Sequence, residues 1–205
     1  MKTTKQYNYS VPLPANIPPT VVLSVMQSCI PFMTTSKTII SFTEQAPDPS
    51  VAADDPFFGP WDDSFRCFQC QEVISLAPRL SKTIEYQVLF KPTPDGVRTR
   101  AAAAAGVTIR SDYSVRPRPG PTSPAGSDST GSSVTVVGDE YELNEDMSIE
   151  ANSLLMQFVT GKALDAHQHI VNAIIDQITK NYFGVPIAVP WENDGNGTWR
   201  RITNP

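Results

Sequence analysis

The sequence lacks the features that mark secretion, membrane spanning or nucleic-acid binding. Its first residues hold no apolar run of the roughly 7–15 residues found in a signal peptide, and no apolar stretch approaches the ~20 residues needed to cross a bilayer. Three cysteines, an odd number, do not make a disulfide framework. The net charge of −5 repels phosphate groups, which argues against nucleic acid as a partner. We therefore expect a cytoplasmic protein without a membrane span.

Familiar catalytic and metal-binding motifs are also missing. The absence of GxSxG, of a P-loop, of GxGxxG at a strand–helix junction and of HExxH disfavours serine-hydrolase, nucleotide-driven and nicotinamide chemistry. Nothing points to a bound cofactor. Cys67 and Cys70 have CxxC spacing, but residues three apart on a strand point to opposite faces, so one metal cannot take both. His167 and His169 lie about 200° apart on a helix and cannot chelate together either. No metal site is expected.

The composition is that of one globular domain. The chain has 205 residues, of which 40% are hydrophobic and 18% charged. Alternating apolar and polar residues predict strands, and a helix is expected to begin near Asn16, where Pro18 and Pro19 follow a capping side chain. The expected strands cover residues 5–13, 37–44, 64–76, 80–91, 97 to about 115, and 134–150.

The C-terminal part of the chain changes to a helical period. Apolar residues recur mostly every third or fourth position from about Asn152 to Tyr182. Such a helix would be ~45 Å long, enough to cross a small sheet. The stripe consists of Leu155, Phe158, Ala163, His167, Ile170, Val171, Ile174 and Ile178.

Four segments carry a resemblance to a known superfamily. They are VPLPANIPPTVVLSVM near the start, LFKPTPDGVRTR, GVTIRSDYSV, and YELNEDMSIEANSLLMQFV before the long helix. With the order of elements, they make the chain similar to the START/polyketide-cyclase superfamily, and most similar to an uncharacterised fungal family of that type. A sequence like GLDIREKW is usual there. Arg110 is kept here, whereas Thr108, Ser111 and Tyr113 replace two acids and a tryptophan.

The resemblance implies an α+β fold of the helix-grip type. A curved antiparallel sheet would wrap around the long C-terminal helix and enclose an internal cavity. The domain is expected to cover residues 1–183, with flexible loops at 45–63 and 117–133, followed by an irregular tail at 184–205. Five alanines at 101–105 would leave space inside the sheet.

Three residues are candidates for proton transfer inside that cavity. His167 interrupts the apolar stripe of the helix and could exchange a proton near neutral pH, although a core histidine bonded to a carbonyl explains it as simply. Glu145 shares a strand face with Tyr141, Leu143, Met147 and Ile149. It would have a raised pKa in a dry cavity, unless a β-bulge turns it outward. Tyr86 is the tyrosine expected to assist.

Further residues are candidates for binding a ligand. Arg110 could hold a carboxylate or enolate oxygen, with Asp112 on the same face, although such a pair on a strand is more often an exposed ladder. Aromatic residues of loop 45–63 could fold over the cavity mouth or simply pin the loop to the core. The complete set is Arg110, Asp112, Tyr113, Tyr141, Phe158, Phe57, Phe58 and Trp61.

The expected function follows from the resemblance and these polar residues. It is a cofactor-independent cyclase, isomerase or dehydratase acting on a hydrophobic secondary-metabolite intermediate, a polyketide or terpenoid, by templating and single-residue proton transfer. One alternative is a non-catalytic lipid or metabolite carrier. Another is an interaction protein whose cavity is filled by side chains. The expected partner is a hydrophobic small molecule, with a homodimer as a further option.

Overall fold

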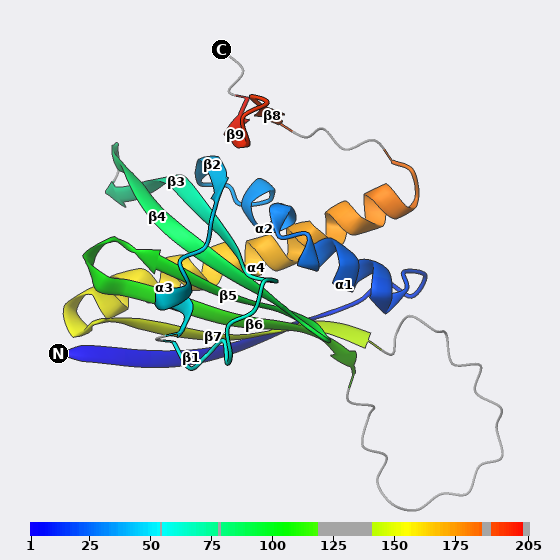
Figure 1. The fold of residues 1–205 in the computed structure, drawn as a ribbon, viewed down its shortest axis with the longest axis horizontal. Helices are drawn as coiled ribbons and strands as arrows, with labels where there is room; N and C mark the ends of the chain where they lie inside the picture. The colour runs from blue at the N-terminus through cyan, green and yellow to red at the C-terminus, as the bar shows by residue number, and fades with distance from the viewer. Residues whose placement is uncertain (54, 78, 119–140, 186–189, 203–205) are drawn as a thin grey trace, which may run out of the picture.

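The structure is a computed structural model that describes residues 1–53, 55–77, 79–118, 141–185 and 190–202. It consists of one curved antiparallel sheet and a long helix, α4, which lies behind the sheet in Figure 1. The α+β class, the curved antiparallel sheet and the long C-terminal helix are thus as predicted. None of the described helices is long and apolar enough to cross a membrane.

The elements follow one another in the order of a strand, short helices, a run of strands and the long helix. The helices are α1 (Pro19–Gln27), α2 (Ile30–Thr34), α3 (Pro49–Ala53) and α4 (Ser153–Tyr182). The strands are β1 (Lys2–Pro12), β2 (Ile39–Gln45), β3 (Arg66–Ala77), β4 (Leu80–Thr93), β5 (Gly96–Ala103), β6 (Val107–Pro117), β7 (Tyr141–Asn152), β8 (Trp191–Asn193) and β9 (Thr198–Arg201).

The strand order is β1-β7-β6-β5-β4-β3-β2-β9-β8, so β1 and β2, which follow one another in the sequence, lie far apart in the sheet. β1 pairs with β7 at one end of the sheet, and β2 lies near the other, so α1 and α2 carry the chain across one face. α4 contacts β7, β1, α1 and α2 on that same face. We call the face that packs against α4 the inner face and the opposite one the outer face.

Helix α4 begins and ends where the apolar period predicts. The side chain of Asn152 accepts a hydrogen bond from the backbone N–H of Leu154 at 3.0 Å, which caps the first turn. Ala163, Val171, Ile174 and Ile178 are buried against the sheet. The predicted stripe is therefore packed along most of its length, but Phe158, which was predicted to belong to it, is exposed.

The region expected as one strand from residue 97 to about 115 is two strands. β5 and β6 form a hairpin whose turn covers Ala104–Gly106, with Ala105 at φ 60° and Gly106 at φ 73°. The alanine run thus ends a strand instead of continuing it. Only glycine fits at position 96, in the turn between β4 and β5, because a Cβ atom there would lie 1.7 Å from the backbone carbonyl oxygen of Tyr113.

The tail predicted to be irregular adds two strands to the sheet. β9 pairs with β2, and β8 pairs with β9, which extends the sheet beyond β2. The indole N–H of Trp191 donates to the carbonyl of Thr34 at 3.1 Å, and Trp199 stacks on Phe42 with ring centroids 6.0 Å apart. The predicted loop 117–133 and the beginning of the predicted strand 134–150 fall largely outside the described residues.

The segment before β3 crosses the outer face, not the cavity side. Phe57, Phe58 and Trp61 pack with Phe65, Cys67 and Leu89 in a cluster on that face. Phe58 is 2% exposed, and Trp61 stacks on Phe65 with centroids 4.5 Å apart. The idea that these aromatics close the mouth of a cavity is therefore wrong, whereas the alternative that they pin the loop is confirmed.

Candidate functional site

The candidate site lies where β6, β7 and α4 meet on the inner face. The register pairs Tyr113 of β6 with Glu145 of β7, and strand alternation places Ser111 on the same face as Tyr113. His167 faces them from α4, four residues from the buried Ala163 and Val171. Three elements thus bring together four polar side chains inside an otherwise apolar layer.

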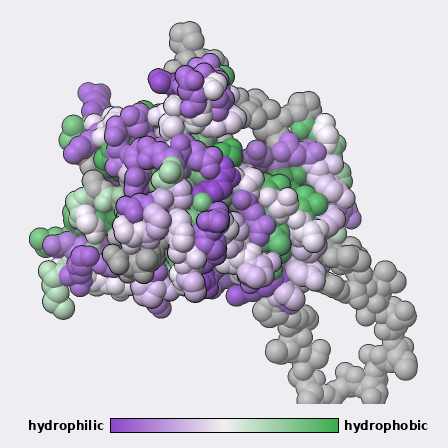
Figure 2. Space-filling model, in the orientation of Figure 1, coloured by the Kyte–Doolittle hydropathy of each residue, from purple (hydrophilic) through white to green (hydrophobic). Residues whose placement is uncertain are grey.

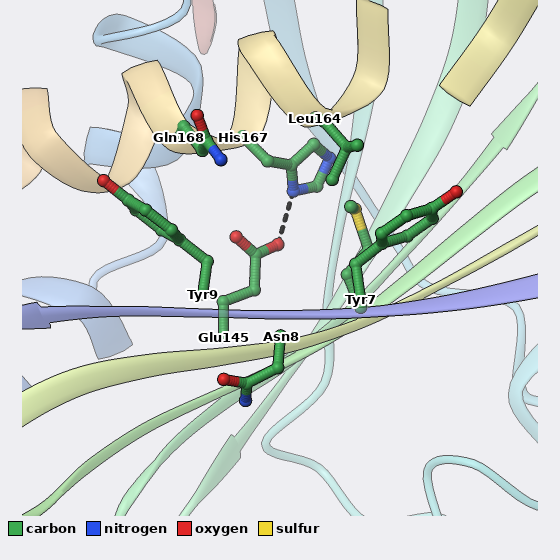
Figure 3. A pocket seen from close by; sticks show the side chains of 8 residues that line it. Tyr7, Asn8, Tyr9, Glu145, Leu164, His167 and Gln168 are labelled. Atoms are coloured by element: carbon green, nitrogen blue, oxygen red, sulfur yellow. Dashed lines mark hydrogen bonds and ion pairs between the residues drawn. The ribbon is translucent and has the colours of Figure 1, made fainter. Parts of the chain in front are cut away.

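Glu145 is the centre of this cluster. It is 2% exposed, and β7 runs through it without a bulge, so the alternative in which a bulge turns it outward is wrong. Its Oε1 accepts a hydrogen bond from the Ser111 hydroxyl at 2.7 Å and lies 2.5 Å from Nδ1 of His167. Figure 3 shows the imidazole of His167 directly above this carboxylate.

The protonation of Glu145 differs from the sequence-based expectation. Burial raises the pKa of this carboxyl, but the charge of a protonated His167 and hydrogen bonds from His167, Ser111 and Tyr113 lower it further, so its pKa lies below the ordinary value of 4.5. The predicted raised pKa is wrong because the carboxylate is not alone in its dry surroundings. Glu145 is ionised at neutral pH and acts as an acceptor for its neighbours.

Tyr113 completes the cluster from β6. Its hydroxyl lies 3.1 Å from Nδ1 of His167, and its side chain is 2% exposed. Burial, followed by the charge of Glu145, raises the pKa of this phenol well above 10. Tyr113 therefore stays protonated and can donate its hydrogen to the ionised carboxylate.

These contacts define the orientation of the imidazole. Because ionised Glu145 can only accept, Nδ1 of His167 carries the hydrogen at their 2.5 Å contact. In the neutral ring, Nε2 then has the free lone pair. Among the described residues Nε2 has no hydrogen-bond partner, and it lies on the side of Leu164 and Tyr7 in Figure 3.

A small pocket adjoins the histidine between α4 and β1. In this conformation it has room for about one water molecule. Tyr7 and Tyr9 of β1 flank the Glu145–His167 pair in Figure 3, whereas Asn8 points away toward the outer face. The lining residues are Tyr7, Asn8, Tyr9, Glu145, Met147, Leu164, His167 and Gln168.

Tyr86 does not join this cluster. It stands on β4 opposite Cys70 of β3, two strands beyond β6, and its hydroxyl interacts with Glu72. Burial and then the charge of Glu72 raise the pKa of Tyr86 well above 10. The tyrosine beside the catalytic candidates is therefore Tyr113, for which the sequence predicted only ligand contact.

The predicted ligand-binding pair Arg110 and Asp112 lies on the outer face. Arg110 donates to Asp55 at 2.8 Å and to Glu150 at 3.4 Å, and Asp112 accepts from Arg98 at 2.8 Å. An interior ligand cannot reach these side chains because the sheet separates them from α4. The alternative of a ladder of ion pairs is correct.

Two other predicted binding residues stand apart from His167. Tyr141 starts β7 and packs at the edge of the larger apolar cluster. Phe158 is 46% exposed near the start of α4, with the Lys162 ammonium 4.6 Å from its ring centroid. Neither residue lines the described pocket.

The geometry of the CxxC pair is confirmed. Cys67 packs in the outer-face cluster and Cys70 in the inner-face core, so the two thiols lie on opposite faces of β3. Burial raises the pKa of both thiols, for Cys70 to about 12. Among the described residues, no cluster of His, Cys, Asp and Glu could hold a metal ion.

The chain belongs to the family DUF7053, described as a domain of unknown function, which matches residues 2–180. The match includes β1, α4 as far as Lys180 and every residue of the Glu145 cluster, and it ends before the β8–β9 hairpin. A search of curated proteins found no match.

Proposed function

We propose that this protein is a cofactor-independent acid–base catalyst in which Nε2 of His167 takes and returns one proton of a hydrophobic small molecule. The observation that carries the proposal is the buried Glu145–His167 contact of 2.5 Å, which leaves Nε2 beside the pocket. A base held by a third group through its other nitrogen is the arrangement that general base catalysis requires.

The surroundings of His167 support a neutral, mainly apolar substrate. Ionised Glu145 lies behind the imidazole and disfavours an anion beside it, while it stabilises the imidazolium that forms when Nε2 takes a proton. Tyr7, Met147 and Leu164 offer apolar surface in the lining of the pocket. An isomerisation, a cyclisation or a loss of water in a polyketide or terpenoid intermediate each needs only such proton transfer.

The size of the pocket sets a condition on this proposal. A space for about one water molecule does not hold such an intermediate, so rim residues have to move when it binds. Tyr7 and Leu164 are half-buried and Gln168 is exposed, and side chains of this kind change rotamer readily. The cavity of the helix-grip type would thus open between α4 and β1.

The apolar packing of the inner face favours one rival, an interaction protein without a ligand. Two apolar clusters occupy the inner face on either side of the Glu145 cluster. In such a protein, the polar cluster would only align α4 with the sheet. The carrier alternative lacks a comparable observation, but it predicts a bound, unaltered ligand and is tested together with the others.

Proton exchange tests the proposal without knowledge of the natural substrate. The protein is incubated in D₂O with a panel of small hydrophobic ketones, and loss of α-protons is followed by ¹H NMR, alongside native mass spectrometry of protein exposed to a metabolite extract. We expect exchange with at least one ketone, reduced by ~10²-fold in His167→Gln and in Glu145→Gln.

His169→Gln is the matched control. This second histidine of α4 lies about 200° around the helix from His167 and donates a hydrogen bond to the backbone carbonyl of Thr35, so exchange should stay at the wild-type rate. Equal rates in all four proteins would refute the acid–base role. Recovery of an unaltered ligand without exchange would establish the carrier, and neither ligand nor exchange would favour the interaction protein.

A further inference from the structure

One end of the molecule exposes large apolar side chains on two neighbouring elements. Leu154 and Phe158 near the start of α4 are 87% and 46% exposed, and Leu80 at the tip of the β3–β4 hairpin is 56% exposed. Because Leu154 and Phe158 are four residues apart, they lie on one side of the helix. Side chains of this size are mostly buried elsewhere in the described chain.

A direct contact joins these two elements into one surface. The Lys162 ammonium of α4 donates to the backbone carbonyl of Ser75 in β3 and lies 4.6 Å from the ring centroid of Phe158. Ser75 pairs with Ser81, the neighbour of Leu80. At the left of Figure 2, apolar and polar surfaces accordingly stand next to each other. We call Leu80, Leu154, Phe158, Arg79, Lys82 and Lys162 the tip surface.

The charge of this end is opposite to that of the whole chain. Residues 74–84 and 152–164 contain Arg79, Lys82 and Lys162 and no acidic residue, although the chain has a net charge of −5. All three cations are exposed. The acids beyond these segments include Glu150, whose carboxylate is engaged by Lys2 and Arg110, and Glu85 and Asp165, which moderate the local positive field.

We infer that the tip surface binds the surface of a lipid bilayer that contains anionic headgroups. Apolar side chains at the ends of two elements can enter the boundary between headgroups and acyl chains, while lysine and arginine on long stems reach the phosphates. A protein partner fits less well. A stable interface buries about 800 Å² on each side, more than these few side chains supply.

Vesicle co-sedimentation tests this inference with the full chain. The probes are vesicles of phosphatidylcholine alone and vesicles with about 30 mol% phosphatidylserine. We expect binding to the mixed vesicles. This binding should weaken at 0.5 M NaCl, where a Debye length of ~4 Å screens the attraction between the exposed cations and the headgroups. Phe158→Glu and Lys82→Glu should each reduce the bound fraction by about 5-fold or more, since each adds a charge that the surface repels.

Phe183→Glu is the matched control. Phe183 is 56% exposed just beyond the other end of α4, so this variant adds the same charge away from the tip surface and should bind like the wild type. Circular dichroism verifies that each variant is folded. Absence of wild-type binding, or equal binding to neutral vesicles, would overturn the inference.

Self-association is a further outcome that the experiment separates. If light scattering shows a dimer that Phe158→Glu dissociates, and the wild type does not sediment with vesicles, the tip surface joins two copies and the lipid inference fails. None of these residues lines the pocket at His167, so either result leaves the proton-exchange assay unaffected.

Discussion

The two faces of the sheet each bury a carboxylate with a lowered pKa, but they use it differently. On the outer face, Asp55 is 5% exposed and accepts from Arg100 at 3.1 Å and from Arg110 at 2.8 Å. On the inner face, Glu145 is 2% exposed and accepts from Ser111 and His167. In both, hydrogen bonds and opposite charge outweigh the burial that raises the pKa.

What separates the two faces is whether a reactive atom is left over. Arg100 also donates to the carbonyl of Val51 in the segment before β3, and Arg110 also donates to Glu150 of β7, so both cations around Asp55 are engaged in structural contacts. A guanidinium also has no lone pair to offer. His167 differs because no group in the described part of the chain bonds its Nε2, and the imidazole lines a pocket. A perturbed carboxylate alone therefore does not identify a site.

The largest expected effect is on the outer face. Asp55→Asn leaves Arg100 and Arg110 without their shared anion and should lower the free energy of unfolding by about 3 kcal/mol. Urea denaturation followed by tryptophan fluorescence measures it. Asp112→Asn is the control: Asp112 and its partner Arg98 are 32% and 37% exposed, so the loss should stay within about 1 kcal/mol. Equal losses of unfolding free energy in the two variants would show that the buried Asp55 stabilises the fold no more than the exposed Asp112 does.

Replacement of the inner carboxylate should cost less stability. In Glu145→Gln the amide oxygen still accepts from one of the neighbours, although its NH₂ group faces other donors, so we expect a loss of about 1–2 kcal/mol. The same denaturation experiment measures this loss. If Glu145→Gln loses more unfolding free energy than Asp55→Asn, the cluster around Glu145 has a purely structural role, like that around Asp55.

Acid should weaken both faces in the same direction. The pKa of each carboxyl is lower in the folded chain than its ordinary value, 4.5 for Glu145 and 3.8 for Asp55. Each group therefore stabilises the fold above that value, and the contribution disappears as the pH falls through the folded pKa. Denaturation midpoints of the wild type should decrease below about pH 5, and less steeply in Glu145→Gln and Asp55→Asn. Parallel curves would show that neither group is responsible.

Much of this architecture can be predicted from periodicity alone. The helical period from Asn152 to Tyr182 matches α4, because apolar residues that recur every third or fourth position over such a length fit a helix and not a strand. The row of Glu145 with Leu143 and Met147 also follows from alternation on one strand. Proximity of His167 and Glu145 was implied only through the expected fold, in which the helix crosses the inner face.

What could not be predicted from local patterns is how strands distant in the sequence pair. Alternation on β6 separates Arg110 and Asp112 from Ser111 and Tyr113, and the second row also contains Val107, Ile109 and Val115. This apolar row is the one to expect on the inner face, so alternation already argues against Arg110 and Asp112 as contacts of an interior ligand. The register of β6 against β7, which neither strand shows by itself, places Tyr113 beside Glu145. Likewise, the pairing of β9 with β2 depends on contacts between distant segments, including Trp199 with Phe42, that no local pattern shows.

The smallest expected effect isolates the role of Tyr113. Tyr113→Phe removes one hydroxyl near Nδ1 of His167 and keeps the ring that packs against Phe32 with centroids 4.8 Å apart. Stability should fall by about 1 kcal/mol or less, because Glu145 keeps its other donors. ¹⁵N NMR of the imidazole at neutral pH should still report hydrogen on Nδ1, whereas Glu145→Gln should release that preference.

Together, Tyr113→Phe and Glu145→Gln show which of the two side chains sets the tautomer of His167. If Tyr113→Phe alone shifts the hydrogen to Nε2, the phenol and not the carboxylate orients His167. A neutral hydrogen bond from the phenol would then orient the functional group of the inner face. On the outer face, by comparison, ion pairs hold the side chains around Asp55. If only Glu145→Gln shifts it, the carboxylate sets the tautomer, and the free lone pair on Nε2 is a consequence of ionised Glu145.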